Sequence, residues 1–573
     1  MHQKSQELRH YNLVKKDCNK AHNIIVKNSV IILLYLICSG LLWSCSKDNT
    51  QLNNDTFQLE SIKIEEKINL DAFTGVDPEL EVNLQFSEAV NNDLLRQNIV
   101  LRKSSGEHIE LIFTITNKTV LIKPVSPLAS FTIYQFEILR GLYAVSGARI
   151  QTGKVYTITS GMDQTDKLPR ISDEELLTIV QKQTFKYFHE FAHPVSKMAR
   201  ERTTSDNTVT TGGTGFGVMS MILAVERNFI SRTEAINHIQ TIVSFLDTKA
   251  TRYHGAFSHW INGETGATIP FSTYDNGADL VETSLLFQGL LASRQYFDNS
   301  SDEEIKLRDD ITKLWKEVEW DWFQKDNEKV LYWHWSPNNG WQMNLKVSGW
   351  NESLITYVLA ASSPTHPINK EVYDQGWARN GEMVNNSTYY GHKLALGPEL
   401  GGPLFFAHYS FLGLDPNRLQ DQYANYWEQN RNHTLINYQY CVDNPENFAG
   451  YSENNWGLTA SDGNEGYSAY SPTNDKGVIA PTAALSSIPY TPVESMRALH
   501  FFYYKLGDKL WSDYGFKDAF NLSEGWFDDQ YIAINQGPII IMIENYRTGF
   551  MWNLFMDIPE IEQGLINLGF QIQ

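Results

Sequence analysis

The spacing of apolar residues changes near residue 165, and this change divides the chain into two parts of different fold class. Before it, short runs such as 80–86 and 132–138 alternate apolar and polar side chains, which is typical of half-buried strands. Turn residues separate these runs at the spacing of a small β-sandwich. We therefore predict an all-β domain over residues 58–160 and a boundary in the polar segment that follows it.

Helix signals dominate the chain after this boundary. The capping-box pattern, in which Ser or Thr precedes Glu by three residues, occurs at Ser172, Ser231, Ser301 and Thr491, each time before an amphipathic segment. We expect roughly eleven or twelve helical segments between residues 171 and 565, joined by long loops. This pattern predicts an α/α barrel or toroid whose loops build a cleft. A helical solenoid is the alternative, but no fixed repeat of about 30–50 residues supports it.

The glycine-rich segment 212–217 resembles a phosphate-binding loop only superficially. It has no preceding apolar strand and no following Lys, so nucleotide binding is rejected. We expect instead a helix N-terminus that another backbone approaches closely.

Three carboxylates, Asp275, Asp279 and Glu282, open the apolar run 283–291. On a helix their spacing would place all three on one face near the N-terminus, where the helix dipole tolerates negative charge. A solvated acidic first turn is the plain interpretation. The aromatic flanks, and the lack of Lys or Arg between residues 270 and 294, favour a partly buried cluster with at least one raised pKa, as acid catalysis requires.

Composition narrows the class of partner. The formal net charge of −20 argues against nucleic acid or anionic lipid, because neither would be attracted to the chain. Aromatic residues make up 13% of the chain, and aromatic rings beside carboxylates are what a sugar-binding cleft needs. The loop segments 254–260, 331–337 and 456–463 carry Trp and His, either as buried strand pairs or as the lining of sugar subsites. Glu352, after a Gly-Trp turn, is either a helix-terminus charge or an acid in the cleft.

The N-terminal sequence indicates a targeting segment. Residues 30–43 are apolar but too short to span a membrane comfortably, and Ser44 and Cys45 follow them. This resembles a bacterial lipoprotein signal, so we expect a signal peptide over 1–45, lipidation of Cys45 and a tether over 46–57. The chain would then lie in the cell envelope of a Gram-negative bacterium, at its outer membrane, held only by the lipid. Cleavage without lipidation, or an uncleaved anchor, is the alternative.

Cysteine usage predicts neither disulfides nor a metal centre. Of Cys18, Cys38, Cys45 and Cys441, only Cys441 would remain as a free thiol after processing, and no Cys/His spacing suits metal ligation. We expect no metal and no cofactor.

Two resemblances refine this picture. Segments 86–90, 122–124 and 127–134 resemble bacterial Ig-like domains, which implies a spacer or interaction module. Segments 211–217, 274–283, 349–353, 457–462, 480–484 and 536–547 resemble the glycoamylase-like domain, whose characterised members are β-1,2-glucanases acting on sophorooligosaccharides. The resemblance spans residues 165–573. It implies an (α/α)6 barrel after the all-β Ig-like sandwich, with metal-independent and inverting hydrolysis.

The same resemblance implies roles for single residues. Asp275, Asp279 and Glu282 fall on the family's acidic cluster, and Glu352 falls on its general-acid candidate. Asn535 stands where we expect Asp in relatives. If that Asp helps to activate water, Asn535 cannot do so.

Together these observations predict an exported glycoside hydrolase of β-1,2-glucan that acts as a monomer, with Glu352 as acid and Asp275 or Asp279 as base. The candidates for substrate binding are Glu282, Tyr274, His259, Trp260, Trp335, Trp456, Asp462, Glu465, Tyr467, Asn535 and Glu544. Two alternatives stay open: a surface glycan-binding lipoprotein without catalysis, and an exo-acting α-glucosidase.

Overall fold

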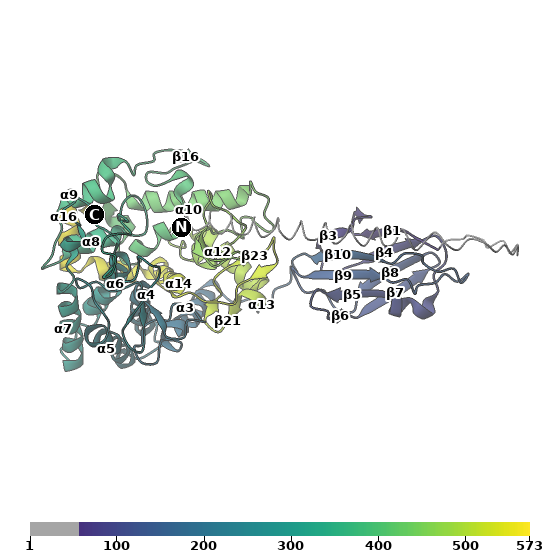
Figure 1. Ribbon diagram of the computed structural model, residues 1–573, viewed down its shortest axis with the longest axis horizontal. Coiled ribbons are helices and arrows are strands. Elements are labelled where there is room, and N and C mark those ends of the chain that lie inside the picture. The colour runs from purple at the N-terminus through teal and green to yellow at the C-terminus, as the bar shows by residue number, and fades with distance from the viewer. Residues whose placement is uncertain (1–56, 573) are drawn as a thin grey trace, which may run out of the picture.

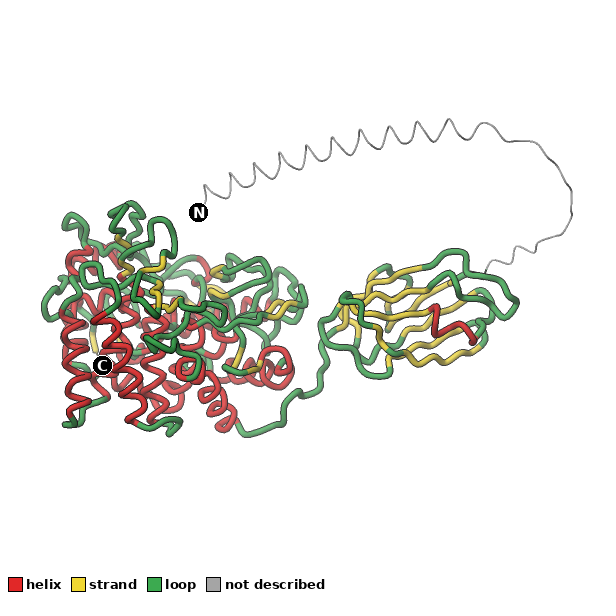
Figure 2. Tube along the Cα trace, turned by 60° about the horizontal axis from the view of Figure 1, so that its bottom comes forward, coloured by secondary structure: helices red, strands yellow, loops and turns green. Residues whose placement is uncertain are grey.

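The computed structural model describes residues 57–572, which form a β domain and a larger helical domain (Figure 1). The two lie end to end along the long axis of the molecule, joined by one connecting segment (Figure 2). The predicted signal peptide, Cys45 and nearly all of the predicted tether lie outside the described residues. Within 57–572, no helix is long and apolar enough to cross a membrane.

The β domain is a sandwich of two five-stranded sheets. One has the order β2 (Lys67–Ile68), β1 (Leu59–Ile64), β4 (Val82–Phe86), β8 (Thr119–Pro124), β7 (Leu111–Thr116); the other has β3 (Ala72–Val76), β10 (Lys154–Ser160), β9 (Ile133–Ile138), β5 (Ile99–Lys103), β6 (His108–Ile109). Neighbours are antiparallel, except for the parallel pair β3–β10. In β4 the buried residues Val82, Leu84 and Phe86 alternate with polar ones, as the sequence pattern predicted.

The connecting segment is fastened to the helical domain. The backbone N–H of Lys167 donates to the carbonyl of Tyr504, and the Lys505 ammonium donates to the carbonyl of Gln164. Phe131 of the β domain meets Phe527 with ring centroids 6.1 Å apart. These contacts hold the β domain against one side of the helical domain.

The helical domain has two kinds of helix. One kind is buried on nearly every side: α4 (Thr211–Glu226), α6 (Leu280–Tyr296), α8 (Leu354–Ser362), α11 (Pro481–Leu485) and α14 (Ala533–Thr548). The other kind buries one face: α3 (Asp173–His189), α5 (Arg232–Thr248), α7 (Asp302–Lys316), α10 (Tyr426–Asp443), α12 (Pro492–His500) and α16 (Pro559–Leu568). The buried helices pack on one another (α4 on α6 and α14, α6 on α8) and the one-faced helices pack outside them (α3 on α4, α16 on α8). The domain is therefore built in two helical layers.

Shorter elements complete the domain. They are α9 (Lys370–Val372), α13 (Gly507–Leu510), α15 (Phe550–Met556), β11 (Thr208–Thr210), β12 (Trp260–Asn262), β13 (Thr268–Ile269), β14 (Ala278–Asp279), β15 (His334–Trp335), β16 (Thr388–Tyr389), β17 (His392–Lys393), β18 (Leu419–Gln420), β19 (Ala460–Ser461), β20 (Ser468–Ala469), β21 (Trp511–Ser512), β22 (Gly515–Phe516), β23 (Phe520–Asn521), β24 (Trp526–Phe527) and β25 (Gln571–Ile572). Figure 2 shows long loops and short strands gathered on one side of the aligned helices.

The predicted capping boxes are confirmed in part. Ser172 and Ser231 make the full reciprocal pair with Glu three residues later. Ser301 accepts from the Glu304 N–H, but the Glu304 carboxylate binds Arg232 instead. At Thr491 the prediction is wrong, because its hydroxyl donates to the carbonyl of Ser487 in the preceding turn.

The glycine-rich segment forms the start of α4, and the predicted close approach is confirmed. A Cβ on Gly215 would lie 2.1 Å from the carbonyl oxygen of Leu285 in α6. A Cβ on Gly289 would lie 2.0 Å from the carbonyl oxygen of Gly215. Glycine at these two positions lets α4 and α6 touch backbone to backbone, and this contact places the N-terminal ends of both helices at the same site.

Candidate active site

A cavity of about 370 Å³ opens among the loops at the N-terminal ends of the buried helices. Its lining combines three acidic side chains with six aromatic ones. The lining residues are Glu201, Arg202, Thr210, His259, Trp260, Phe271, Val281, Glu282, Leu285, Trp333, Glu352, Phe405, Tyr409, Ala460, Tyr467, Ile532 and Ile534. Flat rings with carboxylates between them suit a carbohydrate, which presents both C–H faces and hydroxyl groups.

The three clustered carboxylates do not share one helix face, which corrects the sequence prediction. Asp275 lies in a loop, Asp279 belongs to β14 and caps α6, and only Glu282 lies within the helix. The reason is the pairing of β14 with β15, in which Asp279 stands opposite His334. This pairing keeps the chain extended until Leu280, so the helix begins five residues after Asp275.

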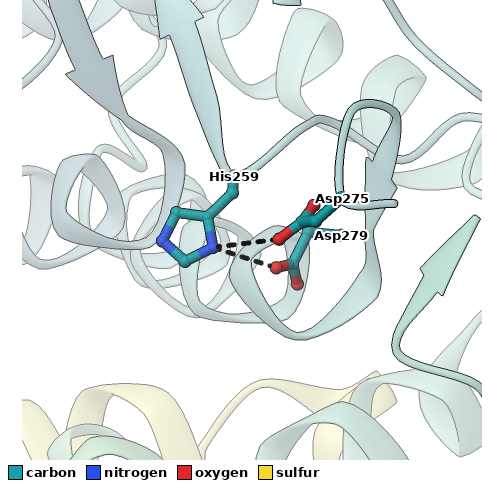
Figure 3. A group of neighbouring side chains, drawn as sticks. All are labelled: His259, Asp275 and Asp279. Carbon is teal, nitrogen blue, oxygen red and sulfur yellow. Dashed lines mark hydrogen bonds and ion pairs between the residues drawn. The ribbon is translucent and has the colours of Figure 1, made fainter. Parts of the chain in front are cut away.

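Asp275 and Asp279 form a buried group with two histidines. His259 Nδ1 lies 3.1 Å from Asp279 Oδ2 and 3.9 Å from Asp275 Oδ2 (Figure 3). His334 Nε2 lies 3.3 Å from Asp275 Oδ2 and 3.4 Å from Asp279 Oδ2. We call these four residues the His–Asp quartet. Two carboxylates facing two imidazoles can balance their charge when both imidazoles are protonated.

The charges of the quartet follow from burial and pairing. Burial opposes protonation of both imidazoles, but the surrounding carboxylates outweigh it and raise the pKa of His259 to about 9 and that of His334 to about 10. Burial would raise the pKa of Asp279, yet the hydrogen bonds from both histidines hold that pKa well below its usual range. At neutral pH both imidazoles are therefore positively charged, and Asp279 between them is negatively charged.

This pairing removes Asp275 and Asp279 from the cavity surface. Their exposed fractions are 3% and 0%, and neither lines the cavity. The sequence named them as base candidates, but their placement makes them partners of the histidines rather than groups facing water. Their effect on the cavity passes through His259, whose ring lies on its wall.

Glu282 is the member of the acidic cluster that does face the cavity. Its Oε2 accepts from the Gly212 N–H at 2.7 Å, and its Oε1 lies 4.0 Å from His259 Nε2. Burial raises the pKa of Glu282 and the protonated His259 opposes this rise. One oxygen is thus anchored on the N-terminus of α4, and the other lies nearer the imidazolium.

Glu352 lines the same cavity, just before α8. Its backbone carbonyl accepts a hydrogen bond from the Ser410 hydroxyl, which fixes the turn that carries it. Burial raises the pKa of Glu352 to about 7, and the charges of Asp279 and Glu282 add to the rise. A carboxyl with this pKa holds its proton near neutral pH, as a general acid must.

Two groups of side chains could offer ligand atoms to a cation. Donor atoms of His259, Asp275 and Asp279 lie within 4.8 Å of one another, and so do carboxylate oxygens of Asp462, Asp518 and Asp528. In the first group the histidines already supply positive charge to both carboxylates. In the second, Arg202 pairs with Asp462 at 2.7 Å. In both places a cationic side chain of the protein already faces at least one of the carboxylates.

Of the residues predicted to bind substrate, four line the cavity: His259, Trp260, Glu282 and Tyr467. Asp462 and Asn535 lie directly behind the wall. Asp462 pairs with the lining residue Arg202, and Asn535 accepts a hydrogen bond from the hydroxyl of Tyr409, which also lines the cavity.

Five other predicted residues lie away from the cavity. Trp456 is fully buried, and its Nε1–H donates to the carbonyl of Glu494. Glu544 is buried in an ion pair with Arg227, at 2.7 Å. Trp335 packs on Trp322, and Tyr274 and Glu465 are exposed without reaching the lining. Charge and aromatic character alone do not show whether such a side chain belongs to the core, the surface or a binding site.

Sequence reasoning missed several lining residues. Trp333 and the quartet member His334 lie in the segment 331–337, which the sequence left open as either a strand pair or a cavity lining. Each interpretation holds for part of the segment, because His334 pairs with Asp279 in a short sheet and Trp333 lines the cavity. Glu201, Phe405 and Tyr409 had no local signal. Glu201 lies in a loop and the other two lie in short 3₁₀ helices, and only the packing of distant helices brings them together.

A larger hollow of about 630 Å³ lies where the two domains meet, lined by Phe131, Arg170, Arg497, His500, Lys505 and neighbouring residues. Its basic groups are already paired: Arg170 and Lys505 with Asp166, Arg497 with Glu453, and His500 with Asp173. None of its lining residues carries a carboxylate, in contrast to the smaller cavity with its three acidic side chains.

Comparison with known proteins identifies the family. A family model described as "Putative glucoamylase" matches residues 344–559, and a bacterial Ig-like domain model matches residues 64–159. The structure of an endo-β-1,2-glucanase from Chitinophaga pinensis, in complex with sophorotriose and glucose, is 51% identical, with a TM-score of 0.69. The match covers 70% of this chain and 99% of that one. This chain belongs to the glycoamylase family.

Two further relatives of this glycoamylase-family chain extend the likeness. A β-1,2-glucanase from Parabacteroides distasonis is 37% identical over 90% of this chain and 73% of its own, with a TM-score of 0.68. An exo β-1,2-glucooligosaccharide sophorohydrolase from Parabacteroides distasonis is 46% identical over 417 residues, 69% of this chain. The matched region spans 58% of the length of that sophorohydrolase.

Proposed function

We propose that this chain is a glycoside hydrolase that cleaves β-1,2-linked glucan or its oligosaccharides. The observation that carries the proposal is Glu352, a carboxyl with a pKa of about 7 in an aromatic-lined cavity that Glu282 also faces. Relatives that cover most of the helical domain are named for activity on β-1,2-glucan, which supports this linkage. We infer further that the two helical layers close into an (α/α)6 toroid around this cavity.

In the proposed reaction, Glu352 gives its proton to the glycosidic oxygen as the bond to the anomeric carbon breaks. A water molecule attacks that carbon from the opposite side, and the Glu282 carboxylate takes the proton that the water loses. The anomeric configuration is thereby inverted. The acid ends deprotonated and the base ends protonated, so exchange with solvent restores the starting state.

The aromatic lining would hold the sugar rings during this reaction. Trp260 and Phe271 meet nearly edge to face, with centroids 4.9 Å apart, beside His259. Trp333 and Phe405 add further ring faces to the lining. Stacking on such ring faces does not distinguish one glucose linkage from another, so selectivity for the linkage would come from the polar side chains between the rings.

A panel of glucans tests the proposed activity. We expect the purified full chain to release new reducing ends from β-1,2-glucan or sophorooligosaccharides and none from starch. Binding of β-1,2-glucan without new reducing ends would contradict catalysis and favour the glycan-binding lipoprotein. Glucose released from starch alone would favour α-glucosidase chemistry. The anomeric form of the first product, read by NMR, tests inversion.

We also propose that the protein is exported and anchored by lipid at Cys45, in the envelope of a Gram-negative bacterium. The apolar run 30–43 followed by Ser44 and Cys45 supports this. In cells given a clickable fatty acid, we expect label on the wild type and none on Cys45→Ser. Cys441→Ser should label like the wild type, because this thiol is buried. Equal label on the wild type and Cys45→Ser would remove the anchor.

A further inference from the structure

The side chain of Asn535 is fully occupied by hydrogen bonds behind the cavity wall. It lies in the first turn of α14 and is 1% exposed. Its Nδ2 donates to the Ala460 carbonyl at 3.0 Å and to Asp518 Oδ1 at 2.7 Å. Its Oδ1 accepts from the Tyr409 hydroxyl at 3.2 Å. Since two acceptors lie on one side of the amide and one hydroxyl on the other, its orientation is fixed.

This orientation decides what Tyr409 offers to the cavity. The phenol has one hydrogen, and that hydrogen is directed at Asn535. Burial raises the pKa of Tyr409 well above its usual range, so the hydroxyl stays neutral and keeps this hydrogen. Tyr409 lines the cavity. Toward a sugar it can therefore present only oxygen lone pairs, and it accepts a hydrogen bond from a sugar hydroxyl.

The same amide also holds a buried acid. Asp518 is 2% exposed, and its Oδ2 accepts from the Asp462 N–H at 2.8 Å. Burial raises the pKa of Asp518 to about 8, although the hydrogen bond from Asn535 opposes the rise. Asn535 is thus the link between this acid and the hydroxyl at the cavity.

We propose that Asn535 is a positioning residue, whose amide turns the Tyr409 oxygen into the cavity as an acceptor for a sugar hydroxyl, and not the remnant of a lost catalytic base. The proposal rests on the hydrolase function proposed above. It also removes the reason for doubting activity, because a water-activating group at residue 535 would be separated from the cavity by Tyr409.

The surroundings require an amide here. An ionised Asp at residue 535 would have no hydrogen to give to Ala460 or Asp518, and three oxygen acceptors would face one another in a buried site. One proton shared between residues 518 and 535 would relieve this repulsion. The fit of an Asp at this position therefore depends on pH, whereas the fit of Asn does not.

The test begins with Asn535→Asp, which keeps the shape of the side chain. On the oligosaccharide that the wild type cleaves best, we expect kcat/KM to fall about tenfold or more, and the loss to grow between pH 5 and 8 as the shared proton leaves. If Asn535 replaces a catalytic base, the same variant should be more active than the wild type. Higher activity would overturn the proposal.

A double-mutant cycle with Tyr409→Phe tests the route of the effect. If Asn535 acts through the Tyr409 hydroxyl, Asn535→Asp should change kcat/KM far less in the Tyr409→Phe background than in the wild type. Independent, multiplying losses would contradict the proposal. Asn437→Asp is the matched control. Asn437 is also buried, and both its amide nitrogen and its amide oxygen bond the backbone of Leu458, but it does not line the cavity. We expect its effect to be the same with or without the Tyr409 hydroxyl.

A stability measurement separates failure of this inference from failure of the proposed function. In Asn535→Asp the new carboxyl gains a raised pKa in the folded state. The free energy of unfolding of Asn535→Asp relative to the wild type should therefore fall as pH rises above about 4, the ordinary pKa of Asp. A wild type inactive on every glucan would refute the hydrolase function and, with it, the role of Tyr409 in binding sugar. A pH-independent stability difference would refute the hydrogen-bond arrangement, whatever the activity.

Discussion

Glu352→Gln should lower kcat on β-1,2-glucooligosaccharides by about 10²–10⁴-fold, the range that a positioned general acid contributes. The amide has the same shape but no acidic proton, so the leaving sugar would depart as an alkoxide. The melting temperature should stay the same or rise, because the carboxyl is desolvated and no ion pair in the described part of the chain depends on it. Steady-state kinetics and thermal unfolding of the full chain measure both.

The choice of leaving group makes this test specific for acid catalysis. From a nitrophenyl sophoroside the leaving group is nitrophenolate, which departs without protonation, so Glu352→Gln should lose far less activity on it than on the natural substrate. Equal losses on both would indicate that Glu352 binds sugar rather than donating a proton. Glu562→Gln, at an exposed position of α16, is the matched control and should behave like the wild type.

The pH profile gives the same role an independent reading. Because Glu352 must be protonated to act and its pKa is about 7, kcat/KM of the wild type should decline as pH rises through 7. The residual activity of Glu352→Gln should lack this decline. A wild-type rate that stays constant from pH 6 to 9 would assign the acid to another residue.

The sequence predicted the fold well because fold-level signals are local. Alternation in 80–86 and the capping boxes at Ser172 and Ser231 each depend on a few neighbouring residues, and the structure has strands and helix starts there. The backbone contact at the start of α4 was predictable for the same reason, since only glycine permits it. Local chemistry decides these features before any tertiary packing exists.

The site was predicted less completely because it depends on contacts that are distant in sequence. Spacing placed Asp275, Asp279 and Glu282 on one helix face, but the pairing of β14 with β15 keeps Asp279 extended and sends two carboxylates to the histidines. That pairing joins residues about 55 positions apart, such as Asp279 and His334, so no local pattern near Asp275 indicates it. Asn535 shows the same limit, since its partners Tyr409 and Asp518 are visible only once the loops are assembled.

The largest stability loss should follow Asp279→Ala, at about 3–5 kcal/mol, the range for breaking a buried ion pair by removing one partner. Asp279 has two tasks. Its Oδ1 accepts from the Glu282 N–H at 2.9 Å and caps α6, and its Oδ2 faces His259 and His334. Asp279→Asn keeps an oxygen for the cap and removes the charge, so it should lose less. The difference between the two variants isolates the cap, worth about 0.5–2 kcal/mol.

Urea unfolding followed by tryptophan fluorescence measures this loss in the right domain. All 15 Trp residues lie outside residues 57–160, and all except Trp43 fall at or after residue 260. The signal therefore reports the helical domain in the full chain, whether or not the β domain unfolds at the same urea concentration.

The pH dependence of the Asp279→Ala difference identifies the quartet as its cause. Asp279 has a lowered pKa in the folded state, so its contribution exists above about pH 4 and disappears as pH falls. The histidines have raised pKa values, of about 9 and 10, so their contribution is complete below about pH 6.5 and is lost as pH rises through these values. The wild type should therefore exceed Asp279→Ala most between about pH 4 and 6.5, and by less at pH 10. A difference that is constant from pH 4 to 10 would mean that Asp279 stabilises the fold only as a helix cap, and that the two histidines are neutral.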